Sequence, residues 1–147
     1  MKYRYLLIDN DNTLMDFHAA EHAALREALT EAGIEPTDAV CARYSAINDA
    51  LWKALERGET THAALKIARF AQLLEEYPAE NVCAPRLALR YSHYLGTHAD
   101  LMPGAEAFLR RLHGQMKIVL VSNGDSVIQR NRLFRCVFTP LLDNIVI

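Results

Sequence analysis

The feature that most constrains the fold is a pair of carboxylates at the end of an apolar run near the N-terminus. Residues 3–8, Tyr-Arg-Tyr-Leu-Leu-Ile, are typical of a buried strand, and Asp9-Asn10-Asp11-Asn12-Thr13 follows directly. Asp and Asn are depleted in strands, so a strand gains no stability by ending in adjacent charges. A site that transfers phosphoryl groups needs this arrangement, because one carboxylate attacks phosphorus and the other handles the proton of the leaving oxygen.

A second apolar run, Lys117-Ile118-Val119-Leu120-Val121, ends in the polar turn Ser122-Asn123-Gly124. Its unbroken apolar character predicts a parallel strand that is buried on both faces. A helix is expected to start at Asp125 or Ser126. The helix is expected to run through Ile128, Leu133 and Val137, with Arg130, Arg132 and Arg135 on a solvated face. Asn144 to Ile147 begin a further apolar strand.

Residues from about 17 to 98 have the pattern of an all-helical insert. Apolar residues recur every three or four positions in four segments, which Gly33, Gly58 and Pro78 separate. Thr37 or Asp38 and the pair Thr60-Thr61 are suited to start the second and third helices. The order of elements predicts an α/β fold. It would have a Rossmann-like parallel-sheet core, made of residues 1–16 and 99–147, and a helical cap subdomain, residues 17–98.

Both polar clusters fall at the carboxyl ends of predicted parallel strands, which is where α/β sheets bind ligands. We expect Asp9 to be the nucleophile and Asp11 the acid/base, and strand alternation would place Asp11 on the same side as Asp9. The two carboxylates are also suited to hold Mg2+. Hydroxyl and backbone N–H groups are expected to bind the phosphate beside the start of the next helix, from Thr13, Ser122, Asn123 and Gly124.

The composition limits the possible partners. A formal net charge of -2 gives no bulk attraction to nucleic-acid polymers or anionic membranes. No run approaches the roughly 18 apolar residues of a membrane span. The N-terminus leads into a predicted strand rather than a secretion signal, so a cytoplasmic location is expected. The expected partner is therefore a small phosphate ester.

The two polar motifs resemble those of a known superfamily. Residues 7–17, Leu-Ile-Asp-Asn-Asp-Asn-Thr-Leu-Met-Asp-Phe, resemble the first motif of the haloacid dehalogenase superfamily, an Asp-x-Asp-x-Thr run on strand one. Residues 119–124 resemble its second motif, and the helices between resemble its inserted cap. Asp16-Phe17, the cap stretches 43–48 and 51–52, and Ser122-Asn123-Gly124 are similar to the pyrimidine nucleotide 5'-phosphatase branch.

That resemblance implies a magnesium-dependent phosphomonoesterase that works through an aspartyl-phosphate, most simply a nucleoside 5'-monophosphate phosphatase. It also implies that Phe17 and residues of the cap contact the substrate. Tyr44, Asn48 and Trp52 lie three to four residues apart and share a helix face. They could stack on and hydrogen-bond a nucleobase, and packing inside the cap explains them equally well.

The sequence also departs from the family pattern. The family usually has an apolar residue where Asn10 stands, and commonly Gly or Asp where Asn12 stands. Its third-motif Lys and fourth-motif acidic residues have no counterpart, since no Lys follows Lys117. We therefore expect a chain that lacks the C-terminal third of the fold and is impaired as a phosphatase, because electrostatic stabilisation dominates phosphoryl transfer.

Without the insert, only about 65 residues remain for the core, which is too few to bury a comfortable sheet. A second copy of the chain, strand exchange or another protein could complete it. A non-catalytic binding module of that kind is therefore an alternative hypothesis. A haloacid dehalogenase that attacks carbon with Asp9 is another. Asp11 weighs against the dehalogenase, because that chemistry needs neither a metal nor a proton for the leaving group.

Overall fold

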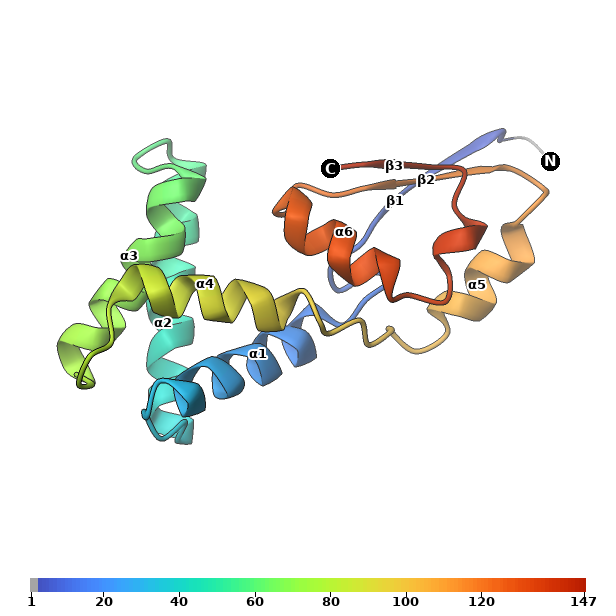
Figure 1. Ribbon diagram of the computed structural model, residues 1–147. Helices are drawn as coiled ribbons and strands as arrows, with labels where there is room; N and C mark the ends of the chain where they lie inside the picture. The colour runs from blue at the N-terminus through green and yellow to red at the C-terminus, as the bar shows by residue number, and fades with distance from the viewer. Residues whose placement is uncertain (1–2) are drawn as a thin grey trace. The chain divides into compact units, whose positions relative to one another are not determined.

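The computed structural model describes residues 3–147, which form two compact units. The core unit combines the N-terminal residues through Glu21 with Leu95–Ile147, and the helical unit is His22–Tyr94. The domain boundaries expected from the sequence, 16/17 and 98/99, lie a few residues outside this division. Along the chain (Figure 1) the elements are β1 (Tyr5–Asp9), α1 (Phe17–Glu31), α2 (Asp38–Glu56), α3 (His62–Glu76), α4 (Ala84–Leu95), α5 (Ala105–Leu112), β2 (Lys117–Val121), α6 (Ser126–Phe134), the 3-10 turn η1 (Thr139–Leu141) and β3 (Asn144–Val146).

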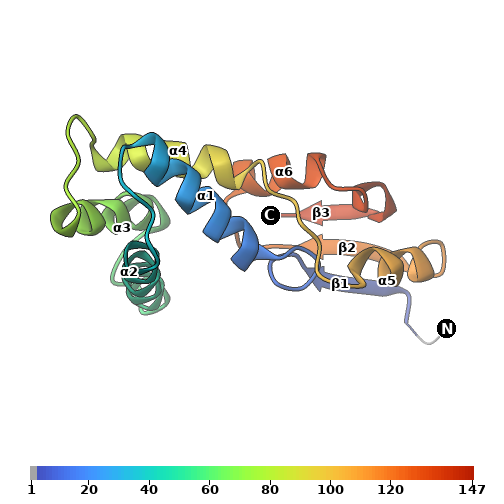
Figure 2. The same cartoon turned by 90° about the horizontal axis from the view of Figure 1, so that it is seen from below.

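The core unit is built on a three-stranded parallel sheet in the order β1-β2-β3. Helices α5 and α6 cover the same face of this sheet (Figures 1 and 2). On that face Ile118 and Leu120 are fully buried and pack against Leu109 of α5 and Leu133 of α6. This confirms the predicted α/β class with a parallel sheet.

The other face of the sheet differs from the prediction of strands buried on both sides. Tyr5 and Leu7 of β1 are 67% and 69% exposed, and Val121 and Val146 are 39% and 50% exposed. Strand residues alternate between two faces, and α5 and α6 cover only one of them. Within residues 3–147, the unbroken apolar run of Lys117–Val121 therefore does not mean that both faces of this strand are buried.

The predicted orientation of α6 is also wrong in part. Arg130 and Arg135 are exposed as expected, but Arg132 is fully buried, and α6 ends at Phe134, before Val137. The inward stripe contains Gln129, Arg132 and Leu133, whose spacing of three and four residues is that of one helix face. The expectation of a solvated arginine is therefore wrong at Arg132 alone.

The helical unit has an aromatic centre. The ring centroids of Tyr44, Phe70 and Tyr91, from α2, α3 and α4, lie 5.3 to 5.8 Å apart, and all three side chains are fully buried. Thr37 and Thr61 cap α2 and α3, each accepting a backbone N–H from three residues on, at 3.3 and 3.2 Å. Within residues 3–147, no helix combines the length and the apolar character needed to cross a membrane.

Candidate active site

The strand register brings the two polar motifs to one edge of the core sheet. Asp9, the last residue of β1, is paired with Val121, the last residue of β2. Ser122 follows at once, and its N–H donates to the carbonyl of Val146 at 2.9 Å. The Asp9 side chain is exposed and Ser122 is 8% exposed. The carboxyl ends of β1 and β2 therefore present Asp9 and the Ser122 turn next to each other.

The chain turns tightly directly after β1. The carbonyl of Asn10 accepts the N–H groups of Thr13, Leu14 and Met15 at 3.2, 2.8 and 3.0 Å. The N–H of Asn12 donates to the carbonyl of Met15 at 2.7 Å. The N–H group of Thr13, expected as a donor to phosphate, is thus used inside the turn, as is that of Asn12. The exposed hydroxyl of Thr13 is the group that this residue can still offer.

Asn12 has a structural reason to replace the residues that the family prefers. Its φ is +57°, in the left-handed region that Asn adopts more readily than most residues. Its side-chain oxygen accepts the N–H groups of Phe17 and His18 at 3.1 and 3.3 Å. Asn12 therefore fixes the start of α1 relative to the turn that carries Asp11.

The carboxylate of Asp11 is held by two side chains of α6. Its Oδ1 is 2.5 Å from Nη1 of Arg132, and its Oδ2 accepts Nε2–H of Gln129 at 2.5 Å. Strand alternation alone would place Asp11 on the side of Asp9. Asp11 instead lies in the turn beyond β1 and contacts α6, which packs on the covered face of the sheet. Arg132, predicted to be a solvated surface residue, is therefore part of the site.

Arg132 makes further contacts inside the core unit. Its Nε–H donates to the carbonyl of His98 at 2.9 Å, and its guanidinium lies 5.7 Å from the ring centroid of Phe17. Its Nη2 has no hydrogen-bond partner within residues 3–147. Phe17, expected at the substrate, contacts Arg132 in this structure. Its predicted role in substrate binding stays a prediction.

Gln129 links the two motifs. Its Oε1 accepts Nδ2–H of Asn10 at 2.6 Å, while its Nε2 donates to Asp11. Asn10 is fully buried, so the polar residue at this position has a buried polar partner. A Cβ on Gly124 would lie 2.5 Å from Nε2 of Gln129, which is too close for a real side chain. Gly124 is thus required by the side chain of Gln129, besides the close approach to phosphate that its sequence position predicts.

The second motif, Ser122-Asn123-Gly124, is a turn with a hydrogen bond between its first and last residues. The N–H of Gly124 donates to the hydroxyl of Ser122 at 3.1 Å, and Asn123 is exposed. Asp125 caps α6 by accepting the N–H groups of Val127 and Ile128, both at 3.0 Å. A phosphate at this turn would therefore meet the Ser122 hydroxyl and Asn123 more readily than the donors at the start of α6.

The predicted cap residues lie in different environments of the helical unit. Tyr44 belongs to the aromatic centre, and Asn48 is 7% exposed and accepts a hydrogen bond from Arg69 at 3.2 Å. In this structure Tyr44 and Asn48 therefore pack inside the helical unit, which is one of the two explanations that the sequence left open for them. Trp52 is partly exposed, and its ring lies edge-on to His62 with centroids 5.5 Å apart. Of the three, Trp52 has the surface that a nucleobase could reach.

The sequence signal for Gln129 and Arg132 was present but is not a hydrophobic one. Both residues share the helix face of Leu133, at spacings of one to four residues. Polar residues on an otherwise buried stripe indicate either a solvated edge or a buried polar site. Gln129 and Arg132 contact Asp11, which stands more than a hundred residues earlier in the sequence. These contacts show that the two residues form a buried polar site and not a solvated edge.

The carboxylates of Asp9 and Asp11 are donors of the kind that a magnesium ion prefers. Proteins often hold Mg2+ by one or two carboxylates, and waters and substrate phosphate oxygens complete the shell. Asp9 offers an exposed carboxylate, and each oxygen of Asp11 accepts one N–H and keeps a second lone pair. Within residues 3–147 no group of three or more His, Cys, Asp or Glu side chains could hold a metal. Asp9 and Asp11 are the residues that would hold the ion, with few protein ligands.

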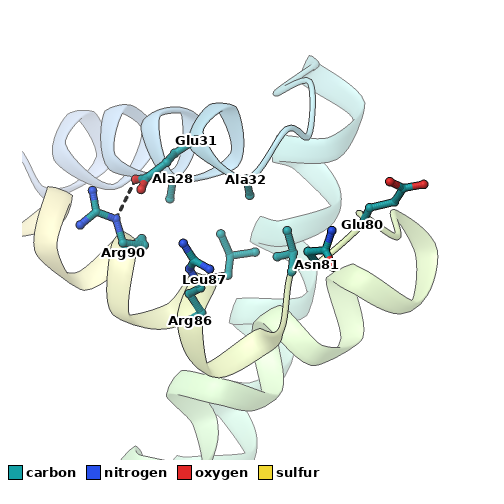
Figure 3. Close-up of a pocket in the computed structure, with 9 residues that line it drawn as sticks. Ala28, Glu31, Ala32, Glu80, Asn81, Arg86, Leu87 and Arg90 are labelled. Carbon is teal, nitrogen blue, oxygen red and sulfur yellow. Dashed lines mark hydrogen bonds and ion pairs between the residues drawn. The ribbon is translucent and has the colours of Figure 1, made fainter.

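A cavity of about 240 Å3 lies elsewhere, inside the helical unit. It is lined by α1, α4 and the loop before α4 (Figure 3), and none of the predicted site residues lines it. Two of its charged groups are paired with each other, since Glu31 accepts hydrogen bonds from Arg90 and Tyr94, both at 2.7 Å. The Tyr94 hydroxyl and Arg90 lower the pKa of Glu31. The cavity therefore does not replace the sheet edge as the candidate active site.

Comparison with known proteins gives the family. The model of haloacid dehalogenase-like hydrolases matches residues 3–145. The HAD-hydrolase YfnB of Bacillus subtilis is 36% identical over 99% of the chain, and the pyrimidine 5'-nucleotidase PynA of Streptococcus pneumoniae is 34% identical over 100% of the chain. The chain spans 62% of the length of each. The crystal structure of YfnB bound to magnesium superposes on 99% of the chain with a TM-score of 0.92 at 35% identity, and the chain covers 63% of it. The chain belongs to the haloacid dehalogenase-like hydrolase family.

Proposed function

We propose that the protein is a magnesium-dependent phosphomonoesterase whose substrates are nucleoside 5'-monophosphates. The observation that carries the proposal is the register of β1 and β2, which puts Asp9 beside the Ser122 turn while Asp11 is held close by. PynA, named as a pyrimidine 5'-nucleotidase, supports the substrate class. A cytoplasmic location stays a prediction from the sequence.

The proposed reaction has two steps on the protein's own residues. In the first, an oxygen of Asp9 attacks phosphorus, the bond to the leaving oxygen breaks, and Asp11 gives that oxygen a proton. In the second, water attacks the phosphorus of the aspartyl-phosphate, Asp11 takes the water's proton, and the Asp9 carboxylate is released. Mg2+ bound by Asp9 and Asp11 would neutralise charge on the phosphate.

The remaining predicted residues would bind the substrate. The hydroxyls of Thr13 and Ser122 and the side chain of Asn123 would hold phosphate oxygens, and Gly124 would keep the turn open. Phe17 and Trp52 are proposed to contact the nucleoside.

The test is a phosphatase assay of the protein as its gene encodes it, with a panel of phosphate esters and added Mg2+. We expect turnover of nucleoside 5'-monophosphates that chelation abolishes. The variant Asp9→Asn should lose at least a thousandfold in kcat, because it lacks the nucleophile. Turnover of no ester, or full activity in Asp9→Asn, would refute the proposal.

The exposed sheet face supports the alternative that the chain is a binding module completed by a second copy of itself. Tyr5, Leu7, Val121 and Val146 present an apolar surface there. Sedimentation velocity of the chain over a hundredfold concentration range tests this, and a monomer throughout would contradict it. The dehalogenase hypothesis is less favoured, because attack on carbon gives Asp11 no proton to transfer.

A further inference from the structure

The buried face of α6 contains two polar side chains where a stable core needs none. Arg132 is fully buried and Gln129 is 2% exposed, on the same helix face as Leu133. A buried charge is costly unless it is paired, and apolar residues of similar volume are often equally stable or more so. Core stability alone therefore does not explain why this stripe carries an Arg and a Gln.

Both side chains are directed at one carboxylate, that of Asp11. Arg132 contacts Oδ1 and Gln129 contacts Oδ2, so each oxygen has its own donor. Two donors on two different oxygens fix the plane of the carboxylate as well as its position. The second lone pair of each oxygen stays available for a water or an ester oxygen.

The two donors are themselves held in place. The Gln129 amide cannot rotate freely, because Asn10 donates to its Oε1 and the backbone at Gly124 lies against its Nε2. Arg132 is anchored by the carbonyl of His98. A supporting group orients a reacting one only if its own side chain is fixed in this way.

We propose that Gln129 and Arg132 are positioning residues that hold the Asp11 carboxylate for its two proton transfers. This inference rests on the proposed phosphomonoesterase reaction. Without the two donors, Asp11 would rotate about its side-chain bonds. It would then deliver a proton to the leaving oxygen less often in the first step, and accept one from water less often in the second.

These two failures depend differently on the leaving group. A nucleoside leaves as an alkoxide, so release of the nucleoside needs the proton from Asp11. 4-Nitrophenolate is a stable anion and leaves without one, so only hydrolysis of the aspartyl-phosphate is slowed. A variant with misplaced Asp11 should therefore release one 4-nitrophenolate per active site quickly and then turn over slowly.

The experiment uses Gln129→Met and Arg132→Met in the protein as its gene encodes it. Arg130→Met is the matched control, because Arg130 lies on the same helix but is exposed. The assays are stopped-flow hydrolysis of 4-nitrophenyl phosphate and steady-state hydrolysis of a nucleoside 5'-monophosphate. Gln129→Met keeps the ion pair, so it decides the question if Arg132→Met does not fold.

We expect kcat for the nucleotide to fall about 10- to 100-fold in both variants, with KM within about twofold. With 4-nitrophenyl phosphate we expect a burst close to one equivalent per site that is larger than in wild type. Arg130→Met should behave as wild type. Equal losses on both esters without a burst, or wild-type kinetics in Gln129→Met, would overturn the inference while the phosphatase proposal stands. A wild-type protein that hydrolyses neither ester would refute the phosphatase proposal and this inference with it.

Discussion

Replacing Arg132 by Met tests the ion pair on which the candidate site is built. Met keeps most of the volume of the Arg stem, so the change removes the charge and its hydrogen bonds without opening a large cavity. Breaking a buried ion pair by removing one partner costs about 3–5 kcal/mol. The Arg132 side chain is 0% exposed but that of Asp11 is 25% exposed, so water can reach the remaining carboxylate. We therefore expect a loss at the lower end, about 3 kcal/mol of unfolding free energy.

The assay is urea unfolding followed by far-UV circular dichroism, with hydrogen exchange to show that the loss lies in α6 and the turn after β1. Arg130→Met is the control and should stay within about 0.5 kcal/mol of wild type, because Arg130 is exposed. Asp11→Asn combined with Arg132→Met should recover about 1 kcal/mol or more relative to Arg132→Met, since it removes the carboxylate that lost its partner. A loss below about 0.5 kcal/mol in Arg132→Met would show that the buried pair does not stabilise the core unit as argued.

Three further changes have expected outcomes. Gly124→Ala puts a Cβ 2.5 Å from Nε2 of Gln129, so it should destabilise the chain by about 1–3 kcal/mol in urea unfolding; an unchanged midpoint would contradict the contact. Hydrogen bonding between Lys117 and Asp143 lowers the pKa of Asp143 below 3.8 and raises the pKa of Lys117 above 10.5. The stabilisation is thus present between these values and lost as the pH falls through the lowered pKa or rises through the raised one. The thermal midpoint of Asp143→Asn should differ most from wild type near neutral pH, and a difference that does not shrink as the pH falls below 3.8 would refute the linkage. Leu7→Lys, at a side chain that is 69% exposed, should change stability by less than about 0.5 kcal/mol but reduce self-association in sedimentation; unchanged sedimentation would argue against the sheet face as a contact surface.

Much of the fold could be predicted because its signals are local. Thr37 and Thr61 cap the helices for which the sequence proposes them, and the strand Lys117–Val121 has the predicted bounds. Capping depends on a side chain and an N–H three residues away, and strand bounds follow the apolar run. The exposure of Leu7 could not be predicted in this way. An apolar strand residue looks the same whether or not another element covers its face.

Only those site residues that belong to a recognisable motif could be predicted from the sequence. Asp9, Asp11 and Ser122 are conspicuous because polar groups end apolar runs. Gln129 and Arg132 are not, because a polar residue on a helix is usually solvated and only a distant partner shows otherwise. The error over Arg132 therefore arises from a contact that spans 121 positions of the chain, which no local pattern reports.

The geometry changes what the second motif does for the site. If the Ser122 turn acted only on phosphate, the helix after it could begin at any nearby residue. It begins at Ser126 because Asp125 caps it, and this fixes which residues reach the buried face one and two turns later. Gln129 is the residue one turn on, and Arg132 follows it on the same face. A shift of one residue in the start of α6 would rotate that face by about 100° and would direct both donors away from Asp11. The turn therefore acts on Asp11 through the phase of the helix, besides any contact it makes with the substrate.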